Sequence, residues 1–112
     1  MKIEKFVFGM IKIDGKKYLH DIITDGRIVE KWVRKEGHKV YFEDIENFLK
    51  EETECVIFGT GTFGLMKVPE SIKKKLREKG IEVIVEKTSS GIRKFTELVD
   101  KKKVTGFFHL TC

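Results

Sequence analysis

The chain has 112 residues, of which 40% are hydrophobic and 37% are charged, and its formal net charge is +5 at pH 7. This length favours a single domain, residues 1–112, and excludes a two-lobed enzyme. No apolar run approaches the ~20 residues that a membrane-spanning helix needs, and the N-terminus shows no secretory signal. With only two cysteines as well, we expect a cytoplasmic protein with free thiols and no membrane partner.

The composition is biased towards lysine, glutamate and isoleucine, and it lacks alanine and glutamine. A scarcity of thermolabile amides and an excess of ion-pairing residues are typical of proteins from hot environments. Genome base composition can produce a similar bias, so the source stays open.

Two clusters of positive charge lie on predicted helices. Five cations crowd one of them, in which Glu70 and Glu78 are each spaced to pair with Lys74. A run of lysines at 101–103 ends another helix, where cations suit the helix dipole. Both features are typical of a solvated surface, so we do not expect a nucleic-acid partner.

Residues 3–33 are predicted to form an antiparallel β section. Asp14-Gly15 and Asp25-Gly26 each separate two short apolar runs, and Asp-Gly favours tight turns. Trp32 closes the section. Core packing is the expected role of a lone Trp, and a pocket wall is the alternative.

The rest of the chain alternates between helical and strand patterns. The expected elements are, in order, a helix capped by Asp44, a fully buried strand at 55–58, a helix opened by Pro69, a strand at 81–85, a helix at 91–102 capped by Ser90, and a strand at 104–110. A helix that connects two strands of one sheet makes them parallel. The pattern therefore predicts a three-layer α/β domain with a mixed sheet.

Two polar loops are expected side by side at one edge of this sheet. Each follows a strand of the predicted parallel pair, and α/β proteins place ligands at that edge. We therefore expect a ligand-binding pocket between them, lined by Gly59, Thr60, Gly61 and Gly64 of the first loop and by Thr88, Ser89, Ser90 and Gly91 of the second.

The first of these loops satisfies the GxGxxG pattern of dinucleotide-binding proteins. In that fingerprint the helix begins within the glycines, whereas here Pro69 delays it and offers no amide. A turn whose glycines let backbones approach closely is the favoured interpretation, and we expect no cofactor. Phe63 in this loop is expected to pack into the core, and covering a pocket or a partner surface is the alternative.

The second loop carries hydroxyl groups that suit a small anion. The amides at the start of the 91–102 helix add positive potential, and Arg93 falls in its first turn. Capping by Ser90 would use the same groups, so anion binding and simple capping are equally favoured.

His109 is the candidate catalytic residue, as a general acid or base oriented by Asp21 or Thr88. A thiol enzyme that pairs His109 with Cys112 is disfavoured, because residues three apart in an extended strand point to opposite faces. The histidines and cysteines show no metal-ligand spacing, so we expect no metal site.

Several of these features occur together in one known family. They are the ending His109-Leu110-Thr111-Cys112, the Gly59-Thr60-Gly61 loop followed by Gly64, the segment Tyr18-Leu19-His20-Asp21, Trp32 and Thr88. In this combination the chain resembles a family of small domains of unknown biochemical activity. The animal members of that family include an adipogenesis-associated domain protein and an assembly factor for mitochondrial respiratory complex I.

This resemblance implies a three-layer α/β fold with a mixed five-stranded central sheet, in which one strand is antiparallel to the rest. It also implies that the glycine loop and the chain ending shape a shared pocket, with Asp21, Trp32, His109 and Cys112 among the matched positions. One departure is Gly91, which stands where many relatives have a small Ala-like residue.

We therefore expect an uncharacterised binding or assembly-type protein with a small polar pocket. A small anion and a protein are the candidate partners, and a homo-oligomer stays open. The alternative is a small enzyme that uses His109 as a general acid or base in that pocket.

Overall fold

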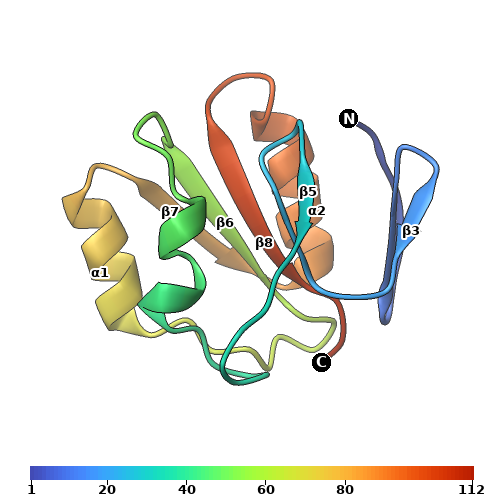
Figure 1. Ribbon diagram of the computed structural model, residues 1–112, viewed down its shortest axis with the longest axis horizontal. Helices are drawn as coiled ribbons and strands as arrows, with labels where there is room; N and C mark the ends of the chain where they lie inside the picture. The colour runs from blue at the N-terminus through green and yellow to red at the C-terminus, as the bar shows by residue number, and fades with distance from the viewer.

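A mixed five-stranded sheet forms the centre of the computed structural model, which describes residues 1–112. Across the sheet, the strands are β5 (Val29–Lys31), β4 (Ile22–Thr24), β8 (Val104–His109), β6 (Cys55–Thr60) and β7 (Glu82–Glu86). β4 is antiparallel to both of its neighbours, whereas β6 is parallel to β7 and to β8. The predicted fold class is confirmed, with β4 opposed to the other strands. Figure 1 shows β7, β6, β8 and β5 of this sheet.

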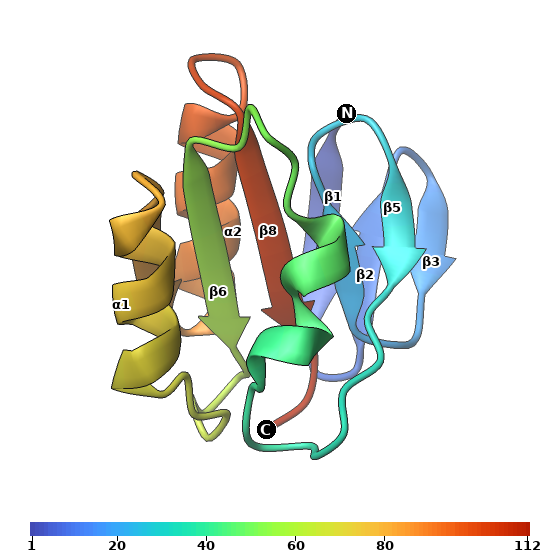
Figure 2. The same cartoon turned by 60° about the vertical axis from the view of Figure 1, so that its left-hand side comes forward.

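Both faces of this sheet are buried, which explains why its central strands are apolar without alternation. Val56, Phe58 and Phe107 pack on one face, under α1 (Glu70–Glu78) and two 3₁₀ helices, η1 (Phe42–Asp44) and η2 (Glu46–Phe48). Ile57 and Phe108 pack on the other, under α2 (Thr88–Leu98) and a second, smaller sheet. The result is three layers (Figure 2).

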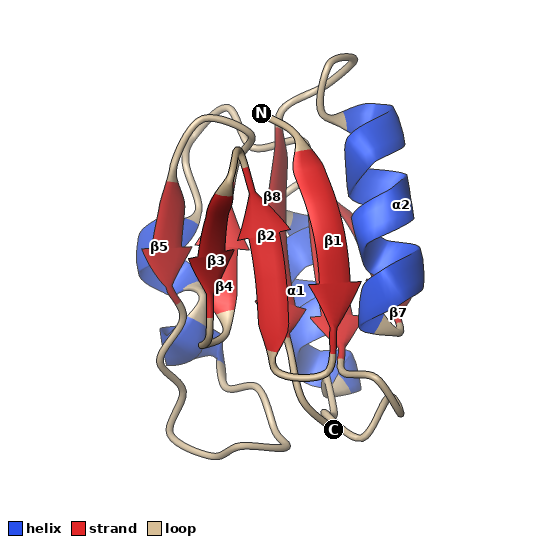
Figure 3. Ribbon diagram, turned by 90° about the vertical axis from the view of Figure 1, so that its right-hand side faces the viewer, coloured by secondary structure: helices blue, strands red, loops and turns tan.

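The second sheet is antiparallel and consists of β1 (Ile3–Val7), β2 (Met10–Ile13) and β3 (Lys16–Tyr18). Ile11 and Ile13 of this sheet are buried in the same core as Ile22 and Phe108. The predicted N-terminal β section is thus present but divided, because β4 pairs with β8 and thereby joins the central sheet with β5. Figure 3 shows the small sheet in front of the central one.

The helix predicted from Asp44 is wrong, since the chain forms only the short helices η1 and η2 there. An N-cap side chain accepts hydrogen bonds from amides that follow it. The Asp44 carboxylate instead accepts from the preceding amides of Tyr41 (2.8 Å) and Lys35 (3.3 Å). Its carbonyl oxygen accepts from the Trp32 indole (2.9 Å), so Asp44 fastens the loop to the core.

The last helix, α2, begins at Thr88, two residues before the predicted cap. Ser90 therefore lies within the first helical turn, and the prediction that it caps the helix is wrong. The N-cap residue is Lys87, whose side chain makes no capping hydrogen bond, and the Thr88 hydroxyl makes its hydrogen bonds to Gly61 and His109 outside the helix. The helix predicted from Pro69 is confirmed, with Pro69 at its N-cap and Ile72 and Leu76 buried.

Candidate functional site

One edge of the molecule, which we call the carboxyl edge, contains the ends of β6 and β8 and the segments that follow them. The amide of Thr62 donates to the Thr111 carbonyl (2.7 Å), and the amide of Leu65 donates to the Cys112 carbonyl (3.0 Å). The turn between β1 and β2 joins them, since the Gly9 amide donates to the Leu110 carbonyl (2.8 Å). Figures 2 and 3 show the C-terminus at this edge.

The two predicted polar loops do meet at this edge, where they hydrogen-bond directly to each other. The Gly61 amide donates to the Thr88 hydroxyl (2.8 Å), and the Thr88 amide donates to the Gly61 carbonyl (3.2 Å). A Cβ on Gly59 would lie 3.0 Å from Thr88 Cα. Direct contacts thus join the two loops, and neither loop lines the three larger cavities of the chain. The pocket between them stays a prediction.

Position 61 requires a glycine, because the backbone of the chain ending passes close to it. The φ of Gly61 is +106°, and a Cβ there would lie 2.3 Å from the carbonyl carbon of Cys112 and 2.9 Å from Cδ2 of His109. The glycines thus let backbones approach closely, as in the favoured interpretation of the loop. The dinucleotide fingerprint lacks its helix within the glycines, since α1 begins only at Glu70.

Other members of the predicted pocket have structural partners or face outward. Thr60 is buried and its hydroxyl donates to the Glu86 carbonyl (3.1 Å). Ser89 is exposed, whereas Gly64 and Ser90 are half-buried and Gly91 is buried against the sheet. Ligand binding by these residues stays a prediction.

A buried charged network links three parts of the carboxyl edge. The Asp21 carboxylate accepts hydrogen bonds through Oδ2 from Arg34 Nη1 (2.7 Å) and His109 Nδ1 (2.7 Å), and through Oδ1 from the Leu110 amide (2.7 Å). The side chains of Arg34 and His109 are only 5% and 6% exposed. Because Asp21 precedes β4 and His109 ends β8, their antiparallel pairing brings these two residues together.

Burial by itself would raise the pKa of the Asp21 carboxyl. The hydrogen bonds from His109, the Leu110 amide and Arg34 outweigh burial and hold that pKa below its ordinary value. Asp21 is therefore ionised at neutral pH. Its charge stabilises both the guanidinium and the orientation of the imidazole.

The contact with Asp21 also assigns the tautomer of His109. Nδ1 lies 2.7 Å from the Asp21 carboxylate, which only accepts, and 3.2 Å from Arg34 Nη2, which only donates. The shorter contact, to the carboxylate, assigns the proton to Nδ1. In the neutral ring, Nε2 is then free to accept, and it lies 3.4 Å from the Thr111 hydroxyl. This is the orientation that a carboxylate imposes on a general-base histidine. Thr88 does not touch the imidazole, because its hydroxyl donates to the His109 backbone carbonyl (2.6 Å).

Arg34 is the member of this network that the sequence analysis missed. Its guanidinium lies 4.4 Å from the Trp32 ring centroid, a cation–π geometry, and Nη2 donates to the Gly37 carbonyl (2.8 Å). Trp32 itself is buried, so its expected role in the core is confirmed. The available signal was the Trp-x-Arg spacing, because alternate residues of an extended segment share a face.

Exposed apolar side chains gather at the same edge. Of the eight large hydrophobic residues that are exposed, six lie at this edge: Val7 at the end of β1, and Phe8, Leu19, Val33, Phe63 and Leu65 in turns and loops. The rings of Phe8 and Phe63 contact each other, 6.4 Å apart, and are 56% and 62% exposed. The prediction that Phe63 packs into the core is wrong, because the Gly61 turn directs the loop outward over the chain ending.

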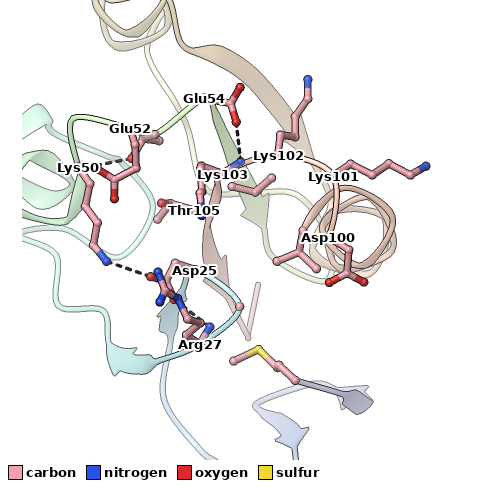
Figure 4. Close-up of a pocket in the computed structure, with 15 residues that line it drawn as sticks. Asp25, Arg27, Lys50, Glu52, Glu54, Asp100, Lys101, Lys102, Lys103 and Thr105 are labelled. Atoms are coloured by element: carbon pink, nitrogen blue, oxygen red, sulfur yellow. Dashed lines mark hydrogen bonds and ion pairs between the residues drawn. The ribbon is translucent and has the colours of Figure 1, made fainter.

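The largest cavity lies at the opposite edge, where β6 and β8 begin. It measures about 350 Å³, and charged residues of both signs line it, including Asp25, Arg27, Lys50, Glu54 and Lys101 (Figure 4). Lys50 and Asp25 form an ion pair across it (3.1 Å). Neither polar loop contributes to this cavity. No group of His, Cys, Asp and Glu side chains in the chain is arranged to hold a metal ion.

Residues 3–109 match the model of one protein family, described as a protein of unknown function (DUF498/DUF598). The chain belongs to this family. It is 32% identical to the conserved hypothetical protein PH1505 from Pyrococcus horikoshii OT3, with a TM-score of 0.91 and all of both chains covered. None of the helices in this family member has the length and apolar character that crossing a membrane requires.

Two more distant structures share the fold alone. One is described as an outer membrane protein from Bartonella henselae and is 22% identical, with a TM-score of 0.80 over 98% of this chain and 94% of that one. The other is the Rpa2829 protein from Rhodopseudomonas palustris, 15% identical, with a TM-score of 0.79 over 96% of this chain and 81% of that one.

Proposed function

We propose that this DUF498/DUF598 member is a cytoplasmic binding or assembly-type protein that docks a protein partner at its carboxyl edge. The observation that carries this proposal is the exposed aromatic pair Phe8–Phe63, together with Val7 and Leu65, which are also exposed and lie within two residues of Phe8 and Phe63 in the chain. We call these four residues the apolar edge cluster. Clustered exposed apolar side chains are typical of interaction sites, because leaving them in water is unfavourable.

The backbone under this cluster supports a docking role. Hydrogen bonds from Gly9, Thr62 and Leu65 to the chain ending fix the turn and the loop that present the aromatic rings. A surface that is already ordered loses less conformational entropy on binding. The resemblance to an assembly factor of mitochondrial complex I favours the same class of function.

The test compares Phe8→Ser/Phe63→Ser with Ile28→Ser, which removes an exposed hydrophobic residue at the opposite edge. Tagged wild-type protein is purified from its native host, and a co-purifying partner is then isolated and titrated by calorimetry. We expect the double variant to bind this partner at least about tenfold more weakly, and Ile28→Ser to bind it normally. Undiminished binding by the double variant would contradict the proposal.

Sedimentation of the purified chain alone tests whether the partner is a second copy. If self-association occurs and depends on Phe8 and Phe63, the docking surface is a homo-oligomer interface. If the chain is monomeric, the partner is a different protein.

The contact between Asp21 and His109 (2.7 Å) favours a second candidate function, general acid–base catalysis by His109. Nε2 is the atom that would accept or donate the proton, next to the Thr111 hydroxyl. A screen with chromogenic esters, phosphoesters and glycosides tests this candidate. If the wild type turns over a substrate and His109→Gln does not, the result supports this candidate. If the wild type and His109→Gln have equal turnover, the result counts against it.

A further inference from the structure

We infer that the partner segment recognised at the carboxyl edge is acidic and carries a large apolar side chain. This inference rests on the proposed docking function and names the chemistry of the partner. The apolar edge cluster supplies the apolar half of the recognition. The charges around it supply the other half.

Two lysines at the glycine loop, Lys67 and Lys87, have no carboxylate partner. Lys87 is exposed, and its side chain passes along the glycine loop, with Cγ 3.4 Å from the position that a Cβ of Gly64 would take. Lys67 follows the same loop, is exposed, and is held by backbone hydrogen bonds to His38 (2.7 Å) and Val40 (2.9 Å). Neither lysine forms an ion pair within the chain.

Three side-chain carboxylates at this edge already have ion-pair or hydrogen-bond partners. Asp21 binds Arg34 and His109, Glu86 pairs with Lys94 (2.9 Å), and Glu36 accepts from the Tyr41 hydroxyl. Among the side chains named here the unpaired charge is positive, and the two lysines exceed the single negative charge of the Cys112 terminal carboxylate at this edge. The potential of this edge complements an acidic segment and opposes a basic one.

The opposite edge differs in this respect. The cavity there mixes cations with carboxylates from Asp25, Glu52, Glu54 and Asp100. Exposed large hydrophobic residues are also fewer there, namely Met1 and Ile28. Only the carboxyl edge combines an aromatic cluster with uncompensated lysines, which is the combination that an acidic segment with an apolar anchor requires.

A random peptide library selected on the immobilised protein tests this inference. The test variant is Lys67→Glu/Lys87→Glu, and the matched control is Lys101→Glu/Lys103→Glu, which makes the same charge change at exposed lysines of the opposite edge. We expect the wild type and the control to select acidic peptides that contain an aromatic or large aliphatic residue. The test variant should bind those peptides at least about tenfold more weakly and should select basic ones instead.

Three outcomes would overturn the inference. They are selected peptides with no excess of acidic residues, equal selections on the wild type and on Lys67→Glu/Lys87→Glu, and binding to vesicles of anionic phospholipid in place of any peptide. If binding depends on Phe8 and Phe63 but not on the lysines, the docking proposal stands and only the charge assignment fails. If binding depends on neither pair, both fail.

Discussion

At the scale of single residues, Asp21 makes the most consequential contacts in the protein. Its two carboxylate oxygens bind a guanidinium, an imidazole and a backbone amide that come from two distant segments of the chain. A buried ion pair adds little to stability compared with apolar packing, but the loss of one partner leaves the other charge buried without compensation. Arg34 is that partner, since its side chain is almost fully enclosed.

Asp21→Asn is therefore expected to destabilise the protein at neutral pH by about 3–5 kcal/mol. The folded-state pKa of Asp21 is lowered, so its contribution is present above the ordinary carboxyl pKa of about 4 and is lost as the pH falls through the lower folded value. Urea unfolding at neutral and acidic pH measures this. The wild type should lose more stability than Asp21→Asn between those two conditions.

Asp25→Asn is the control for this prediction. The pKa of Asp25 is also lowered, by amide hydrogen bonds and by Lys50 against the effect of burial, but its pairing partner Lys50 is half exposed to solvent. We expect a cost of about 1 kcal/mol or less. An effect as large as that of Asp21→Asn would show that burial of the ion pair is not the cause.

The two cysteines are expected to differ in reactivity. Burial, and to a smaller extent Glu82, raises the pKa of Cys55 to about 11, so almost none of it is thiolate near neutral pH. Cys112 is only half-buried. With Ellman's reagent the native protein should therefore release the signal of one thiol quickly, and the second should react only after denaturation. Cys112→Ser should remove the fast phase, and its persistence would contradict the assignment.

At the scale of elements, the close contacts of the glycine loop with β8 and α2 decide which glycines can be replaced. The Gly91 position of α2 has ordinary van der Waals room, since a Cβ there would lie 3.5 Å from its nearest neighbours in Gly59, Ile57 and Phe108. Gly61 has none. A small Ala-like residue at position 91, which the resemblance implies for relatives, would therefore fit this packing.

Gly91→Ala is expected to stabilise the protein by about 0.5–1 kcal/mol, because alanine restricts the unfolded chain and favours the helix. Gly61→Ala should destabilise it by more than about 2 kcal/mol, through both its positive φ and its overlap with Cys112. Gly80→Ala isolates the backbone term, since Gly80 has φ +79° and open space around it. Equal costs at positions 61 and 80 would exclude the overlap as a cause. Thermal unfolding of the three variants measures them.

At the scale of the whole molecule, the chain ending joins parts that the strand order separates. It contacts the β1–β2 turn of the small sheet, the loop after β6 and the segment before β4. The two sheets and the glycine loop are thus held together at the carboxyl edge by residues 109–112. This arrangement presents the apolar edge cluster.

Deletion of residues 111–112 should loosen the glycine loop selectively. The amides of Thr62 and Leu65 lose their acceptors and should exchange with deuterium faster, whereas the Gly9 amide keeps the Leu110 carbonyl and should stay protected. Residue-resolved hydrogen exchange measures all three. Equal deprotection of Gly9 would mean that the whole edge unfolds rather than the loop alone.

The local patterns of the sequence are strong enough to determine most elements. Asp25-Gly26 places the β4–β5 turn, the unbroken apolar run at Cys55 places a central strand, and Pro69 and Gly80 bracket α1. Each of these signals acts within a few residues, through backbone conformation or through burial on both faces. The paired strands then put the two polar loops at one edge, as expected.

Contacts between distant residues decided the rest. Asp44 hydrogen-bonds to preceding amides instead of capping a helix, the Thr88 hydroxyl donates to the His109 carbonyl of β8, and the two polar loops hydrogen-bond directly to each other. Arg34 could be placed with Asp21 only after β4 had paired with β8. The sequence by itself thus determined the elements and the edge at which they meet. Only the tertiary structure decided that this edge is a closed polar network with an apolar surface, because short side chains choose partners by proximity in space, which no local pattern encodes.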